Sequence, residues 1–255
     1  MRRTMARLAV ATALGVGMNA GCAVRPESAD YYFTTPETVS AARAIRRGDA
    51  RSLERMIAGG LDVSARGREG MDLLKWSMGR FCLECFETLL ERGADIERPP
   101  AGEYTGKIEQ LFLMPVMELA AQLNDPAYLA LLLRHGGNPN ALDVYGARTI
   151  IHEAIMLQRI ENVRLLVEAG ADINARADLS LATPLHTAVA VDHYDIAHYL
   201  LEQGADSTLE DSAGHTIGDD IKMFKDRGVG DKEMHAWYAK VVEWLGLDLD
   251  AVTIQ

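Results

Sequence analysis

The sequence predicts an all-α fold made of stacked repeats, and two observations carry this prediction. The first is a phrase that returns three times, at residues 91–96, 168–174 and 202–206, each copy containing Gly-Ala-Asp after an apolar run. The second is the spacing, because Gly170 and Gly204 of the last two copies lie 34 residues apart. A fixed period in this range is typical of arrays in which each repeat packs on its neighbours.

Within a repeat, local signals indicate two helices followed by a loop. Pro184 suits the first turn of a helix, where its missing N–H costs nothing, and Thr183 before it can cap that helix. Val163 and Leu166 lie at helical spacing on one face of a second helix. Gly170 then stands at a helix end, where a positive φ is wanted.

The openings at residues 183–188 (Thr-Pro-Leu-His-Thr-Ala) and 149–154 (Thr-Ile-Ile-His-Glu-Ala) carry a family resemblance. Together with the Leu-Leu-x-x-Gly-Ala-Asp close at residues 200–206, they resemble the ankyrin repeat. The resemblance implies an all-α ankyrin-repeat solenoid, with helix pairs joined by hairpin loops and about six repeats including degenerate caps. It also implies that His152 and His186 are structural and hydrogen-bond between neighbouring repeats.

The repeat domain is expected to span residues 39–246, with a tail at 247–255. An amphipathic helix at 231–246, which holds two tryptophans, is expected to cap its C-terminal end. Gly93 and Gly136 lie 43 residues apart, and the excess over the usual period falls near residues 98–114. Insertions in such arrays fall in loops on one face, often the binding face. We therefore expect this insertion to be the specialised element that distinguishes this array from other arrays of its kind.

The N-terminus differs in kind from the rest. Residues 1–22 combine three arginines, an uncharged run of 11 residues and Ala20-Gly21-Cys22, which indicates a signal peptide. The ending resembles the lipobox of bacterial lipoproteins, which implies lipidation of Cys22. The alternative is ordinary cleavage near Ala20 or Ala23, which would leave a free periplasmic protein.

Residues 23–38 lack helical periodicity and hold two prolines, so we expect a flexible tether. Ala23 after the cysteine indicates, by resemblance to sorting rules, an outer-membrane lipoprotein facing the periplasm. The membrane would then be contacted through the lipid anchor alone.

Composition and motifs restrict the function classes. A net charge of -11 argues against a nucleic-acid partner, since phosphate binding needs a basic stripe. The sequence has no Gly-x-Ser-x-Gly, phosphate-loop or His-Glu-x-x-His motif, so we expect no enzyme, no cofactor and no metal site. A protein partner is expected, with the free chain a monomer.

Cys82 and Cys85 form a Cys-x-x-Cys pair with no second pair elsewhere, so a zinc site lacks ligands. Two alternatives stay open, a small disulfide and two free buried thiols.

The resemblance supplies candidate partner-binding residues, because ankyrin stacks usually meet partners through hairpin tips and the inner face of the first helices. Aromatic and arginine side chains lead, since such anchors carry most interface energy. The candidates are Trp76, Arg80, Tyr104, Lys107, Tyr145, Arg148, Glu153, Met156, Leu157 and Val191, with Leu179 as a further hairpin-tip position.

Two partner classes are considered, the first by analogy with similar exported proteins. Exported bacterial ankyrin proteins include immunity proteins that neutralise secreted antibacterial toxins, often lipases, which is the first hypothesis. The alternative is a scaffold or chaperone for a periplasmic, outer-membrane or oxidative-stress protein.

Overall fold

The computed structural model describes residues 28–98, 114–224 and 232–248. In these residues every regular element is a helix, and the extended pairing is limited to two isolated bridges, Arg66–Asp72 and Leu142–Thr149. The chain divides into two compact units, Met1–Asn138 and Pro139–Gln255. None of the helices in the described ranges is long and apolar enough to cross a membrane.

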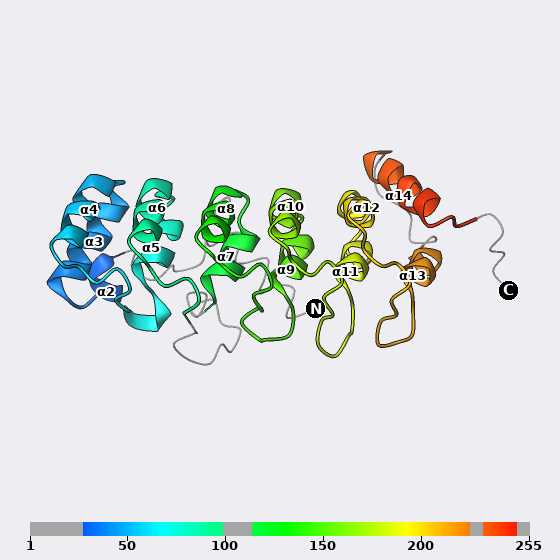
Figure 1. Ribbon diagram of the computed structural model, residues 1–255, viewed down its shortest axis with the longest axis horizontal. Helices are drawn as coiled ribbons and strands as arrows, with labels where there is room; N and C mark the ends of the chain where they lie inside the picture. The colour runs from blue at the N-terminus through cyan, green and yellow to red at the C-terminus, as the bar shows by residue number, and fades with distance from the viewer. Residues whose placement is uncertain (1–27, 99–113, 225–231, 249–255) are drawn as a thin grey trace, which may run out of the picture. The chain divides into compact units, whose positions relative to one another are not determined.

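The first unit is built from three helix pairs, with two short helices before and between them (Figure 1). α3 packs on α5, α4 on α6, and α6 on α8, so successive pairs stack. The helices of this unit are α2 (Ala29–Tyr32), α3 (Pro36–Arg46), α4 (Ala50–Ala58), η1 (Arg68–Gly70), α5 (Leu73–Gly79), α6 (Leu83–Glu91), α7 (Val116–Gln122) and α8 (Ala127–Arg134).

Local sequence explains where these helices begin. Thr35, Asp49 and Asp72 precede α3, α4 and α5, and each side chain accepts an N–H from the residue three positions on. Such caps satisfy backbone donors that the first helical turn leaves without intrahelical partners. The caps therefore fix the starts of helices that are too short to be stable alone.

The expectation of a flexible tether at 23–38 is wrong for residues 28–38, the part of this range that the structure describes. Residues 29–32 form α2, and the Phe33 side chain is 1% exposed. The rings of Tyr32 and Phe33 lie 5.8 and 5.7 Å from that of Trp76. The aromatic run at 31–33 buries its apolar surface against α5, which offsets the cost of ordering the chain.

The second unit also contains three helix pairs (Figure 1). α9, α11 and α13 pack in succession, while α10, α12 and α14 contact α9, α11 and α12 respectively. Its helices are α9 (Ile150–Met156), α10 (Ile160–Glu168), α11 (Pro184–Ala190), α12 (Tyr194–Glu202), α13 (Ile217–Phe224) and α14 (Lys232–Trp244).

The helix expected at 231–246 is confirmed as α14, and it caps α12. Val241 is fully buried, and the Tyr238 ring stacks edge-on against Tyr194 at 5.1 Å. Trp244 remains 53% exposed, so one of the two tryptophans lies at the surface.

The Gly-Ala-Asp turn has the geometry that its sequence predicts. Gly170 and Gly204 both have φ of 89°, and each lies just past the end of a helix. The N–H of Asp172 donates to Oδ1 of Asn140 at 2.7 Å, and that of Asp206 donates to Oδ1 of Asn174 at 2.9 Å. The turns of consecutive repeats are thereby tied to one another.

The domain boundaries differ from the expectation of one repeat domain at 39–246. Ordered structure begins before residue 39, and contacts divide the chain between Asn138 and Pro139. A periodic sequence motif indicates how many repeats there are. It does not indicate where contacts between neighbouring repeats are sparse, which is where the chain divides. Of the expected insertion at 98–114, residues 99–113 lie outside the described ranges, as do Cys22 and the signal segment.

Candidate protein-binding surface

Three hairpin loops precede the inner helices of the second unit, and backbone hydrogen bonds close each one. They are hairpin 1 (residues 141–149), hairpin 2 (175–183) and hairpin 3 (209–216). Asp143 N–H donates to the Arg148 carbonyl at 2.7 Å, Ala177 N–H to Ala182 at 2.9 Å, and Asp211 N–H to His215 at 2.9 Å.

Neighbouring hairpins are also joined edge to edge. The N–H of Asp178 donates to the Ala147 carbonyl at 2.6 Å, which links hairpins 1 and 2. The N–H of Ser212 donates to the Ser180 carbonyl at 2.8 Å, which links hairpins 2 and 3. Short loops that pair in this way form a continuous rim instead of three independent loops.

Two buried histidines anchor this rim to the helices. Nε2 of His152 donates to the Ala182 carbonyl at 3.2 Å, and Nε2 of His186 donates to the His215 carbonyl at 3.2 Å. The structural role expected for both is confirmed, since each reaches from its own helix to the next hairpin. Burial lowers the pKa of His152, because desolvation disfavours the charged ring.

Two carboxylates accept hydrogen bonds from backbone N–H groups of the hairpin tips. Oδ1 of Asp143 accepts N–H groups of Tyr145 and Ala147, at 3.2 and 2.8 Å. Oδ1 of Asp211 accepts those of His215 and Ala213, and these backbone hydrogen bonds lower the pKa of Asp211. Both aspartates are therefore committed to loop structure.

Hairpins 1 and 2 carry a concentration of exposed apolar side chains. Of the seven large apolar side chains that are exposed in the described ranges, four belong to these two loops. We call them the apolar tip residues: Leu142 (50% exposed), Tyr145 (48%), Leu179 (87%) and Leu181 (41%). Exposing several apolar side chains together to water is unfavourable, and patches of this kind are typical of interaction sites.

Hairpin 2 presents its leucines from an unfavourable backbone. Leu179 and Leu181 have φ of 58° and 51°, in the left-handed region that glycine tolerates best. In hairpins 1 and 3 the residues of positive φ are Gly146 and Gly214. Strained backbone conformations cluster at functional sites, so the positive φ of these two leucines marks hairpin 2 as a candidate.

The predicted partner-binding residues fall into different environments. Tyr145 is exposed at the tip of hairpin 1, as a contact residue should be. Half-buried positions are occupied by Arg80, Arg148, Met156, Leu157 and Val191.

Two of these half-buried residues are arginines with partners in the structure. The Arg80 guanidinium lies 4.2 Å from the centre of the Trp76 ring, and Nη1 of Arg148 lies 3.1 Å from Sδ of Met156. Tyr104 and Lys107 lie outside the described residues.

Trp76 and Glu153 are corrected, because neither is accessible. Trp76 is 3% exposed, its Nε1 donates to the Ala42 carbonyl at 2.8 Å, and the α2 segment covers its ring. Glu153 is 1% exposed, because α9 is a short inner helix that α10 and α11 both contact.

Sequence reasoning missed two of the four apolar tip residues, since Tyr145 and Leu179 were expected at hairpin tips. Leu142 and Leu181 were missed because isolated leucines in a loop give no periodic signal. The available hint was composition: residues 178–182 read Asp-Leu-Ser-Leu-Ala, with no glycine where the next hairpin has one.

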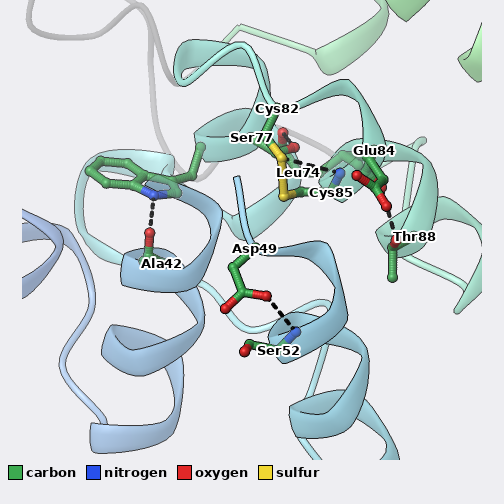
Figure 2. Close-up of a disulfide and its surroundings, with 10 residues drawn as sticks. Ala42, Asp49, Ser52, Leu74, Ser77, Cys82, Glu84, Cys85 and Thr88 are labelled. Carbon is green, nitrogen blue, oxygen red and sulfur yellow. Dashed lines mark hydrogen bonds between the residues drawn. A yellow bond between two sulfur atoms is a disulfide. The ribbon is translucent and has the colours of Figure 1, made fainter. Parts of the chain in front are cut away.

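The structure joins Cys82 and Cys85 in a disulfide at the start of α6 (Figure 2). Of the two alternatives that the sequence left open, this is the one observed. In the described ranges no group of three or more His, Cys, Asp or Glu side chains is placed to hold a metal ion.

Comparison with known proteins agrees with this architecture. Residues 116–211 match the sequence pattern of ankyrin repeats, in three copies. None of the curated proteins matches the chain in sequence.

Two solved structures share the fold. The ankyrin repeat protein EF0377 is 22% identical, with a TM-score of 0.63 over 81% of this chain and 96% of that chain. The ankyrin repeat domain of Bcl-3, described as a unique member of the IkappaB protein family, is 20% identical, with a TM-score of 0.62 over 81% of each chain. Ankyrin repeats generally mediate protein–protein interaction and are typically non-enzymatic. The chain therefore has the ankyrin-repeat fold, with three ankyrin repeats recognisable in sequence at residues 116–211.

Proposed function

We propose that this protein is a non-enzymatic binding module of the bacterial envelope, and that hairpins 1 and 2 contact its protein partner. The observation that carries the proposal is the exposure of the four apolar tip residues on two loops joined by hydrogen bonds. Exposed aromatic and aliphatic side chains on a pre-formed surface supply binding energy at a small ordering cost.

The polar groups of this rim favour binding over catalysis. Asp143 and Asp211 accept hydrogen bonds from their own loops, and His152 is buried with both ring nitrogens in hydrogen bonds. A general base must be able to reach a substrate proton, and these side chains are instead occupied by hydrogen bonds within the protein. A binding surface needs no such reach.

A photo-crosslinking experiment tests the surface. A crosslinking amino acid replaces Leu179 in one variant and Met223, which is 57% exposed on α13, in a matched control. We expect a discrete adduct with the protein partner from position 179 and none from position 223. Equal labelling from both positions would exclude hairpin 2 as the specific contact.

The first candidate partner is a secreted antibacterial toxin, of the lipase type, that the protein neutralises as an immunity protein. The N-terminal signal pattern and the acidic composition support this choice, because an immunity protein must be exported to the compartment where the toxin acts. The gene should therefore lie beside a gene for such an effector. Deleting it should sensitise the strain to neighbours that deliver the effector, and unchanged survival against every such neighbour would remove this candidate.

The alternative is a scaffold or chaperone for a resident envelope protein, including an oxidative-stress enzyme. The two candidates differ in when the partner is present. Purification from envelope extract without any toxin should yield a stoichiometric endogenous partner if the scaffold role holds, and none if the immunity role holds.

We further propose that the chain is exported to the periplasm and anchored through lipidated Cys22. The supporting observation is the lipobox-like ending Ala20-Gly21-Cys22 after an apolar run. Cys22→Ala should release the protein from membranes, and lipid labelling that persists in this variant would refute the assignment.

A further inference from the structure

The Cys82–Cys85 disulfide lies at a position built to accept hydrogen bonds. Cys82 is the residue before α6, and its Sγ lies 3.3 Å from the N–H of Cys85. In the preceding helix pair the same position is held by Asp49, whose carboxylate accepts the N–H of Ser52 at 3.0 Å (Figure 2). One site in the repeat thus holds an anion in one copy and a sulfur in the next.

This correspondence predicts how Cys82 behaves once the disulfide opens. Hydrogen bonds from the Ser52 side chain and backbone lower the pKa of Asp49. A thiolate at Cys82 would face the same backbone donors at the start of a nine-residue helix. Helix N-termini stabilise thiolates and make the corresponding disulfides easier to reduce.

We propose that Cys82 and Cys85 form a thiol–disulfide exchange site, through which a dithiol reductant or a partner thiol joins this protein at Cys82. The two cysteines differ in residue exposure, since Cys85 is fully buried and Cys82 keeps 8% of its surface exposed. Beside Cys82 lies Phe81, which is 59% exposed with φ of 55°. An exposed apolar side chain at this point offers the incoming molecule a contact next to Cys82.

The exchange proceeds in two balanced steps. A thiolate of the reductant attacks Sγ of Cys82, so that a mixed disulfide forms and the Cys85 sulfur leaves as a thiolate and takes up a proton. The second thiolate of the reductant then attacks its own sulfur in the mixed disulfide, and Cys82 leaves as a thiolate. The reductant ends as a disulfide, and its two electrons reside on Cys82 and Cys85.

The small size of the ring argues against a mainly stabilising role. The stabilisation that a disulfide gives by restricting the unfolded chain grows with the number of residues enclosed, and this one encloses two, Leu83 and Glu84. The same turn is already fixed by the N–H of Cys82, which donates to the Ser77 carbonyl at 3.0 Å. Opening the disulfide should therefore leave α5 and α6 folded.

Equilibration with glutathione tests reducibility. The full chain carrying Cys22→Ala is incubated in buffers of graded reduced-to-oxidised glutathione ratio, and thiols are counted by alkylation and mass spectrometry. We expect reversible two-electron reduction within this series and an unchanged far-UV spectrum. A disulfide that stays closed in fully reduced glutathione, or a fold that is lost on opening, would overturn the proposal.

Single-cysteine variants test which sulfur is attacked. In the Cys22→Ala background, Cys85→Ser leaves Cys82 as the one thiol, and Cys82→Ser leaves Cys85, while serine preserves the capping position. We expect Cys85→Ser to form a mixed disulfide with oxidised glutathione at least tenfold faster than Cys82→Ser under native conditions. Equal or inverted rates, with both variants folded, would contradict entry at Cys82. Because the site lies on α6, either result leaves the proposed binding role of hairpins 1 and 2 unaffected.

Discussion

At the scale of single residues, His152 on α9 is hydrogen-bonded to hairpin 2 within the second unit. Its Nε2 donates to Ala182, and its Nδ1 lies 3.0 Å from the Thr149 hydroxyl, which donates to a neutral ring. Protonation would place a second donor at Nδ1 and a charge in a buried position. The anchor is therefore one that acid weakens.

This anchor predicts a pH dependence of stability. Burial lowers the pKa of His152, so the unfolded state binds its proton at a higher pH than the folded state does. The stabilisation is complete above the unfolded pKa of about 6.5 and is lost as the pH falls through the folded pKa. Urea unfolding between pH 7.5 and 5.5 should show a decline that is shallower in His152→Gln, by up to about 1.4 kcal/mol per pH unit. Identical slopes would show that His152 does not titrate differently in the two states.

Trp76 is predicted to act on stability and not on binding. Trp76→Ala should lower the free energy of unfolding by about 3–5 kcal/mol, because it empties a site covered by Tyr32 and Phe33. Trp76→Phe keeps an aromatic ring but removes the N–H that donates to the Ala42 carbonyl. It should lower the free energy of unfolding by about 1 kcal/mol. Denaturant unfolding measures both. A change below about 0.5 kcal/mol in the alanine variant would mean that the α2 segment does not pack here.

At the scale of elements, the positive φ values of the leucines in hairpin 2 are predicted to lower the stability of the folded protein. Leu181→Gly should stabilise the protein by up to about 1 kcal/mol. A left-handed φ costs leucine about 1–2 kcal/mol, and the larger conformational entropy that glycine loses on folding offsets part of the gain from removing this cost. The matched control is Gly214→Leu in hairpin 3, where φ is 79° and no atom lies within 4 Å of an added Cβ. That variant should be destabilised by a similar amount. Loss of stability in Leu181→Gly would argue that Leu181 packs locally.

The cap helix α14 supports the second unit through its buried face. Val241→Asp should destabilise the protein by at least about 2 kcal/mol, because it places a carboxylate at a fully buried position against α12. Trp244→Ala on the exposed face should cost clearly less. Thermal unfolding of the two variants provides the comparison, and equal losses would contradict the packing of α14 described above.

At the scale of the whole molecule, local sequence signals predicted the turns and the helices of the array. The Gly-Ala-Asp turn and the cap helix follow from patterns whose chemistry is local: a glycine needing positive φ and an amphipathic period. The histidine anchors were implied by the resemblance to the ankyrin repeat. The resemblance also implied about six repeats, and the described ranges contain six helix pairs.

What the sequence could not supply depends on contacts between distant segments. Trp76 has the residue type of an interface anchor, yet the aromatic run at 31–33 buries it. Glu153 has the charge of a surface residue, yet two neighbouring helices enclose α9. The apolar tip residues show the converse, since leucines that a pattern would assign to a core are exposed by a strained loop.

The measurement that tests the account most directly is partner affinity after a double substitution at the hairpin tips. Tyr145→Asp with Leu179→Asp changes two exposed side chains, so the free energy of unfolding should move by less than about 0.5 kcal/mol each. Affinity for the partner isolated with the wild-type protein should fall at least tenfold, while Met223→Asp on α13 should bind as the wild type does. Undiminished affinity in the double variant, with its fold intact, would contradict the claim that these hairpins form the binding surface.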